Sequence, residues 1–169
     1  TCFQELKDHV DMWITLNEPW CSAVLGYHEG VHAPGRRDRS ASWAAGHHLL
    51  LGHGGAVHAY RALNLSAPIG ITLNLESPRP ATSTEADHEA ADRAMDLRTR
   101  FFLDPLIEKG YPERHFAAYP SETRPPVRQG DLETIATPIA FLGLNYYFEP
   151  VIAADPTVPE GFTEVSSHH

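Results

Sequence analysis

Three short stretches of apolar and β-branched residues predict β-strands in this chain. They are residues 10–16 (VDMWITL), 69–75 (IGITLNL) and 141–145 (FLGLN). The middle stretch alternates between large aliphatic residues and small or polar ones, as expected for a strand whose successive side chains point to opposite faces. The first strand is expected to stop at Asn17-Glu18-Pro19, because proline cannot donate to a sheet ladder.

Apolar residues spaced three or four positions apart predict helices between these strands. Thr84, with Asp87 three residues later, predicts a helix start, and Pro105 suits the first turn of another helix. The segment from Trp20 to about Arg39 is rich in glycine and proline, so we expect a loop there. The predicted helices cover residues 42–63, 84–101, 104–110 and 131–136.

Strands that alternate with helices are typical of parallel βαβ units, so we expect an α/β fold with a parallel sheet. Three glycines in the longest helix, Gly52, Gly54 and Gly55, are expected to let that helix approach the sheet closely. A sheet of only three strands leaves two open edges, which stable domains rarely tolerate. Residues 155–169 are expected to form an irregular or cut C-terminal end.

Length and composition narrow the class of protein. The 169 residues would suit one domain, and 42% hydrophobic with 21% charged residues excludes a collagen-like or mostly disordered chain. The apolar runs are too short to span a membrane, and residues 1–11 do not resemble a signal peptide. Cys2 and Cys21 cannot make a disulfide framework, so we expect a cytoplasmic protein without a membrane partner.

The charge balance disfavours nucleic acid as a partner. The chain has 13 basic and 22 acidic residues, a net charge of −9, and would repel phosphate backbones. Its one basic cluster, Arg36, Arg37 and Arg39, is short and is expected to lie on a solvated loop.

Polar side chains follow each predicted strand. In parallel α/β folds ligands bind at the carboxyl ends of the strands. These positions hold amides, carboxylates and phenols, which suit a ligand with many hydroxyl groups. A single glutamate at such an edge more often caps a helix or meets an arginine than it catalyses a reaction. The residues concerned are Asn17, Glu18, Asn74, Glu76, Asn145, Tyr146 and Tyr147.

Other chemistries find less support. The histidines of the longest predicted helix, His47, His48, His53 and His58, do not stand four residues apart, so we expect no metal site. The sequence lacks a Gly-x-Ser-x-Gly elbow, a phosphate loop and a Gly-x-Gly-x-x-Gly motif. A serine hydrolase and a nucleotide-dependent enzyme are therefore not favoured.

Residues 13–20 (WITLNEPW) resemble the Thr-(Phe/Leu)-Asn-Glu-Pro signature of family 1 glycoside hydrolases, the β-glucosidase family. Further segments resemble this family in the same order along roughly the first 150 residues, most closely its bacterial members. They are Leu25-Gly26-Tyr27, residues 30–35 (GVHAPG), 44–57, 69–75, 102–106 (FLDPL), 110–112 (GYP) and 141–147 (FLGLNYY).

The resemblance implies a (β/α)8 barrel that hydrolyses terminal β-D-glucosides, such as cellobiose and aryl glucosides, with retention, and a place in cellulose degradation. It implies that Glu18 is the general acid/base, with a pKa raised by a second carboxylate about 5–5.5 Å away. It implies that Asn17 holds the sugar 2-hydroxyl and that Asn145 lines the same subsite. Tyr147, rather than Tyr146, matches the tyrosine that hydrogen-bonds the nucleophile. No metal or organic cofactor is implied.

The departures from the family pattern concern the second carboxylate. The Thr-Glu-Asn-Gly motif of the nucleophile is absent, and Thr163-Glu164-Val165 shares only its first two residues. Glu76 is not favoured as a substitute, because the ends of neighbouring strands would put both carboxylates on one side of the sugar. A (β/α)8 barrel needs about 250 residues. We therefore expect residues 1–169 to be the middle portion of one barrel, with material for strands 4 to 6.

Two hypotheses follow from this comparison. In the first, the chain is part of a β-glucosidase, its partners being the remaining barrel segments and a β-glucoside or oligosaccharide. In the second, it is a non-catalytic sugar-binding or scaffold fragment, inactive alone because it lacks the nucleophile.

Overall fold

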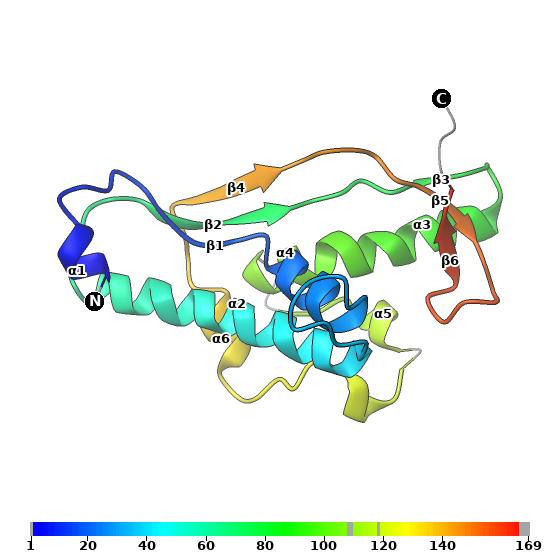
Figure 1. Ribbon diagram of the computed structural model, residues 1–169, viewed down its shortest axis with the longest axis horizontal. Coiled ribbons are helices and arrows are strands. Elements are labelled where there is room, and N and C mark those ends of the chain that lie inside the picture. The colour runs from blue at the N-terminus through cyan, green and yellow to red at the C-terminus, as the bar shows by residue number, and fades with distance from the viewer. Residues whose placement is uncertain (1, 108–109, 118, 166–169) are drawn as a thin grey trace.

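A three-stranded parallel sheet forms the centre of the computed structural model, which describes residues 2–107, 110–117 and 119–165. Its strands lie in the order β1 (Trp13–Asn17), β2 (Ile69–Asn74) and β4 (Phe141–Asn145) (Figure 1). All three predicted strands therefore form. Because they run parallel, their carboxyl ends meet at one edge of the sheet.

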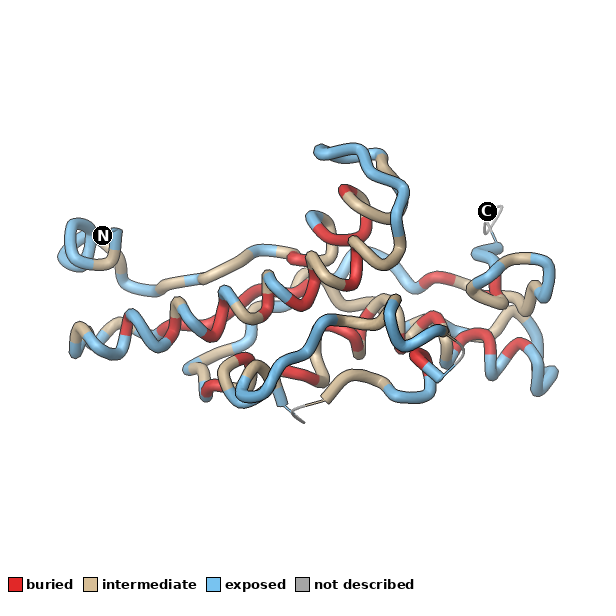
Figure 2. The backbone as a smooth tube through the Cα atoms, turned by 90° about the horizontal axis from the view of Figure 1, so that it is seen from below, coloured by how far each residue is buried: buried red, intermediate tan, exposed pale blue. Residues whose placement is uncertain are grey.

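The long helix α2 (Arg39–Arg61) runs alongside this sheet and supplies much of its core (Figure 1). Asp38 caps the helix by accepting a hydrogen bond from the Ala41 N–H at 3.0 Å. Buried residues recur along its length (Figure 2), as expected for a helix with one apolar face. The main core cluster consists of Ala23, Trp43, Leu50, Ile71, Leu73, Phe101, Phe102, Phe116 and Ile135.

The sequence predicted a loop from Trp20 to about Arg39. This prediction is wrong for Cys21–His28, which form the π-helix η1. Ala23 and Val24 of η1 are buried, and the Ala23 carbonyl accepts a hydrogen bond from the Ser42 hydroxyl of α2 at 2.9 Å. Packing against α2 therefore stabilises helical structure that the glycine- and proline-rich sequence did not predict.

The other helices form largely where the sequence predicts them. Thr84 caps α3 (Glu85–Met95) as expected, its hydroxyl accepting the Asp87 N–H. The chain continues through η2 (Asp96–Arg100) into α4 (Phe101–Ile107) without a break, so Pro105 lies inside α4 and does not begin a new helix. The remaining helices are α1 (Cys2–Leu6), α5 (Glu113–Phe116), η3 (Ser121–Thr123) and α6 (Asp131–Ile135).

A second, small sheet packs against α3 and was not predicted. It has the order β3 (Arg79–Pro80), β5 (Val151–Ala154) and β6 (Phe162–Glu164), with β5 and β6 antiparallel. β6 falls within segment 155–169, which was expected to be irregular. The strand forms because Phe162 packs with Ile152 and the alanines of α3. Residues 166–169 lie outside the described residues.

The glycines of α2 serve a purpose different from the one expected. A Cβ atom at Gly54 would collide with the Thr134 carbonyl of α6, whereas Gly52 and Gly55 have open space around them. Gly54 therefore allows close approach of α2 to another helix and not to the sheet.

The sheet is open at its margins among the described residues. β1 and β4 are its edge strands, and β1 and β4 carry large side chains that are about half exposed, namely Ile14, Leu142 and Leu144. These apolar side chains would be covered in a closed barrel.

Candidate active site

Four side chains at the carboxyl edge of the central sheet form one hydrogen-bonded cluster. Asn17 ends β1, Glu18 follows it, Asn145 ends β4, and Tyr147 lies two residues further on. The Asn145 amide donates to Glu18 Oε1 at 2.7 Å and to Asn17 Oδ1 at 3.2 Å. The Tyr147 hydroxyl donates to the same Glu18 oxygen at 2.9 Å. The structure thus brings together the four residues to which the family resemblance assigned roles.

The backbone at Glu18 is strained. Its φ angle of +49° lies in the left-handed region, which costs a residue other than glycine about 1–3 kcal/mol. Two backbone hydrogen bonds hold it there: the Glu18 N–H donates to the Thr72 carbonyl at 2.9 Å, and the Glu18 carbonyl accepts the Cys21 N–H at 3.0 Å. This turn joins β1 directly to η1 and leaves the Glu18 side chain at the end of the strand.

The hydrogen bonds favour the ionised form of Glu18. Asn145 makes the largest contribution and lowers the pKa of Glu18, partial burial opposes it, and Cys21 and Tyr147 lower the pKa further. The resemblance implied a raised pKa for Glu18, and this expectation is not met in the described residues. The physical reason is that no second carboxylate contacts Glu18 among them. The pKa of Tyr147 is raised in turn by its hydrogen bond to Glu18.

Cys21 is a site residue that the sequence did not point to. Its thiol donates to Glu18 Oε2 at 3.2 Å, so both carboxylate oxygens have partners. Burial, followed by the hydrogen bond to Glu18 and its charge, raises the pKa of Cys21 to about 11. The thiol is therefore protonated at neutral pH and acts as a donor. The only signal for it was its position three residues after Glu18, the spacing of one helical turn.

Glu76 does not join the cluster. Its carboxylate pairs with Arg98 Nη1 at 2.9 Å, and the same nitrogen lies 2.9 Å from Glu164 of β6. The Thr99 hydroxyl donates to the Glu76 carbonyl at 2.7 Å and fixes the backbone after β2. Glu76 thus follows the more ordinary pattern for such a glutamate, a partner arginine.

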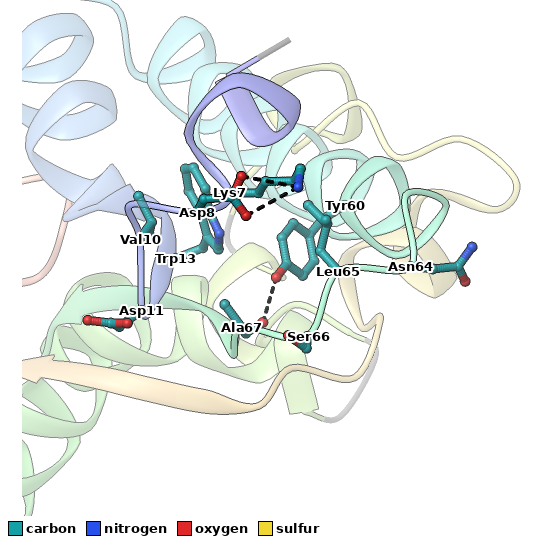
Figure 3. A pocket seen from close by; sticks show the side chains of 10 residues that line it. All are labelled: Lys7, Asp8, Val10, Asp11, Trp13, Tyr60, Asn64, Leu65, Ser66 and Ala67. Atoms are coloured by element: carbon teal, nitrogen blue, oxygen red, sulfur yellow. Dashed lines mark hydrogen bonds and ion pairs between the residues drawn. The ribbon is translucent and has the colours of Figure 1, made fainter.

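Two cavities lie at opposite ends of the sheet. One of about 470 Å³ lies beside the carboxyl ends, where Trp20, Glu76, Arg98 and Phe148 are among its lining residues. The other, of about 410 Å³, lies at the amino ends of β1 and β2, where Trp13, Tyr60 and Ala67 line it together with Lys7 and Asp8 of the N-terminal segment (Figure 3). Only the first of these cavities is at the Glu18 end, and its aromatic and charged lining suits a polar ligand.

The histidines of α2 bind to other side chains. His47 lies 2.8 Å from the Tyr111 hydroxyl and 3.1 Å from Asp131, and His53 lies 2.6 Å from the Thr15 hydroxyl. Within the part of the chain that the structure describes, no group of three or more His, Cys, Asp or Glu side chains could hold a metal ion. Over the same residues no helix is long and apolar enough to cross a membrane.

Comparison with known proteins places the chain among glycosidases. Residues 1–168 match the family described as glycosyl hydrolase family 1. Beta-glucosidase A of Acetivibrio thermocellus is 39% identical over 166 residues, which are 98% of this chain and 37% of the relative. A beta-glucosidase of an Agrobacterium species is 40% identical over 159 residues, 94% of this chain and 34% of the relative. The chain therefore spans little more than a third of the curated relatives it matches.

Solved structures give the same result for the fold. A beta-glucosidase from Exiguobacterium marinum superposes with a TM-score of 0.94 and 40% identity, over 99% of this chain and 39% of the other. The Thermotoga maritima family 1 glycoside hydrolase, complexed with a cyclophellitol analogue as transition-state mimic, gives a TM-score of 0.91 and 35% identity over 99% and 38%. The predicted fold class, α/β and part of a (β/α)8 barrel, is confirmed.

Proposed function

The chain belongs to glycosyl hydrolase family 1, and from this premise we propose that it is the middle portion of a (β/α)8 catalytic domain and carries the general acid/base of a retaining β-glucosidase. The single observation that carries the proposal is the convergence of Asn145 and Tyr147 on one oxygen of Glu18. The substrates proposed are terminal β-D-glucosides, including cellobiose and aryl glucosides.

In this proposal Glu18 acts twice. It first gives its proton to the glycosidic oxygen as the bond to the anomeric carbon breaks, while a second carboxylate attacks that carbon and forms a glycosyl-enzyme. It then takes a proton from the water that attacks the anomeric carbon and displaces the carboxylate, which restores both groups. Asn17, beside Glu18, is proposed to bind the sugar 2-hydroxyl. No step requires a metal or an organic cofactor.

The second carboxylate is proposed to come from a part of the enzyme beyond this chain. Among the described residues, Glu76 is paired with Arg98 and no other carboxylate contacts Glu18. A negative charge brought within about 5.5 Å would raise the pKa of Glu18 and let it arrive protonated. The 72% exposure of Tyr147 supports a site that a further segment completes, and in that site its hydroxyl would donate to the nucleophile instead of to Glu18.

The test is Glu18→Gln in the full-length protein that contains this segment. Hydrolysis of cellobiose, whose leaving group needs protonation, should fall by about 100-fold or more. A 2,4-dinitrophenyl β-glucoside, whose leaving group needs no proton, should still form the glycosyl-enzyme, and added azide should speed its turnover. Undiminished cellobiose hydrolysis in this variant would overturn the proposal.

The second hypothesis, a non-catalytic sugar-binding fragment, applies to the chain by itself. Alone it lacks one carboxylate of the pair, and we expect no hydrolysis of p-nitrophenyl β-glucoside until the other barrel segments are added. Robust activity of the 169 residues alone would contradict the proposal that the nucleophile lies outside this chain.

A further inference from the structure

Strand β1 contains an irregularity just before the catalytic edge. Ile14 pairs with Gly70 of β2, but the next pair is Asn17 with Thr72. Three steps along β1 thus oppose two steps along β2, which defines a β-bulge with one extra residue at Thr15 or Leu16. The backbone hydrogen bonds show the same slip, since Trp13 donates to Pro68 whereas Glu18, and not Asn17, donates to Thr72.

The bulge decides which face of the sheet Asn17 occupies. In a regular strand Ile14 and Leu16 would share a face and Asn17 would point the other way, toward α2. Gly70 and Thr72, two residues apart on β2, share one face, so their partners Ile14 and Asn17 also share it. With the extra residue, Asn17 therefore lies on the same face as Ile14, and Glu18 follows at the edge of the sheet.

The Thr15 side chain bridges the bulge to helix α2. Its hydroxyl donates to the Gly70 carbonyl at 3.1 Å and lies 2.6 Å from Nδ1 of His53. A hydroxyl has one hydrogen, so the hydrogen that goes to Gly70 leaves the oxygen to accept from the His53 Nδ1–H. Hydrogen bonds therefore run from His53 of α2 to Thr15 and from Thr15 to Gly70 of β2, across the irregular part of β1.

His53 is well suited to hold this position. It is fully buried on α2, and burial lowers its pKa to about 4, so the ring is neutral at working pH. Its other nitrogen, Nε2, is buried and has no hydrogen-bond partner among the described residues. The hydrogen bond to Thr15 is therefore the polar contact that orients the ring.

We propose that His53 is a positioning residue for the catalytic edge, which acts through Thr15 to hold the β1 bulge and so aims Asn17 and Glu18 at the sugar. The inference rests on the proposed function, because it concerns how the acid/base is aimed. It makes His53 part of the machinery although the ring contacts neither substrate nor Glu18.

The test compares Thr15→Val with Thr137→Val in the full-length protein. Both substitutions remove a hydroxyl that contacts a histidine of α2, since Thr137 lies 2.7 Å from Nε2 of His58, but of the two only Thr15 lies on β1 and bonds β2. The readout is the ratio of kcat/KM for cellobiose to kcat/KM for 2,4-dinitrophenyl β-glucoside. Misplacing an acid by about 1 Å can cost about 100-fold, and only the first substrate needs the acid.

We expect Thr15→Val and His53→Leu each to lower this ratio by about 10-fold or more. Thr15→Ser, which keeps the hydroxyl, and Thr137→Val should stay within about twofold of the unchanged protein. A double variant, Thr15→Val with His53→Leu, should lower the ratio no further than either single one, because both act through one hydrogen bond.

A folded Thr15→Val variant with an unchanged ratio would overturn the inference. If that variant does not fold, nitrogen NMR of the unchanged protein decides: Nδ1 of His53 should carry the proton, and a proton on Nε2 would contradict the order of hydrogen bonds. Failure of the proposed function would look different, because Glu18→Gln would then leave the ratio untouched.

Discussion

Asn145 ends one edge strand of the central sheet and Glu18 directly follows the other, and the Asn145 amide reaches across the end of β2 to donate to Glu18 Oε1 at 2.7 Å. The two residues are 127 positions apart in the chain. This contact makes the largest contribution to the pKa of Glu18 and lowers it. The residue that most stabilises the ionised form of the proposed acid/base thus comes from the third strand of the sheet.

Replacing Asn145 by Leu should raise the pKa of Glu18 in the 169-residue chain. The amide stabilises the carboxylate, so its loss makes protonation easier. Carbon NMR of the Glu18 carboxyl during a pH titration measures the change. Asn17→Ala is the matched control, since the Asn17 side chain accepts from the Asn145 amide but does not contribute to the pKa shift of Glu18, and it should shift the titration less. An unchanged pKa in the Asn145 variant would contradict this assignment.

Glu76→Gln should leave glycoside hydrolysis by the full-length protein within about threefold of its unchanged rate. The Glu76 side chain is engaged with Arg98, and Arg98 keeps Glu164 as a partner when Glu76 is neutralised. The measurement is kcat/KM of the Glu76→Gln variant on p-nitrophenyl β-glucoside. The loss that Glu18→Gln causes on cellobiose serves as the comparison. A loss of about 1,000-fold for Glu76→Gln would instead identify Glu76 as the missing nucleophile.

The folded chain should lose stability as the pH falls from about 6.5 to about 4. Burial lowers the pKa values of both His53 and His115 from 6.5 to about 4. Between these values the unfolded chain binds protons that the folded chain does not, so the free energy of unfolding rises with pH by about 1.4 kcal/mol per pH unit for each histidine. Both Nε2 atoms are buried and have no hydrogen-bond partner among the described residues, so charging either ring is costly.

Urea unfolding at pH 7, 6 and 5 checks this slope. His115→Phe keeps the edge-on ring contact with Trp43 and removes one titrating group, so it should lower the slope by about 1.4 kcal/mol per pH unit. A stability that stays constant between pH 7 and pH 5 would show that these rings are accessible to protons in the folded chain.

Gly54→Ala and Gly55→Ala should have opposite effects on stability, although the two glycines are neighbours on α2. A methyl group at Gly54 meets the Thr134 carbonyl and pushes α2 away from α6, which should cost about 1–3 kcal/mol. A Cβ atom at Gly55 would meet no described atom within 4 Å beyond its own stretch of helix, and the better helix propensity of alanine should add up to about 1 kcal/mol. Denaturant unfolding of both variants measures the difference, and equal effects would contradict the close contact at Gly54.

The amino-acid sequence determined the features that depend on neighbouring residues. Short runs of apolar and β-branched residues located β1, β2 and β4, helical spacing located α2 and α3, and Thr84 marked the start of α3. The motif that contains Asn17 and Glu18 pointed to the family. Such patterns are local because side-chain period and end capping are properties of a few consecutive residues.

Only the tertiary structure decided the features that join distant residues. The β3-β5-β6 sheet, the helical form of η1, the Cys21 thiol at Glu18 and the contact between Thr15 and His53 all depend on packing between separated segments. Proline and glycine residues favoured irregular structure in the segments that form η1 and β6, and burial against α2 and α3 outweighed that preference. The sequence named Glu18 as the acid/base candidate, but the fold placed Asn145, Tyr147 and Cys21 around it, and their hydrogen bonds lower its pKa.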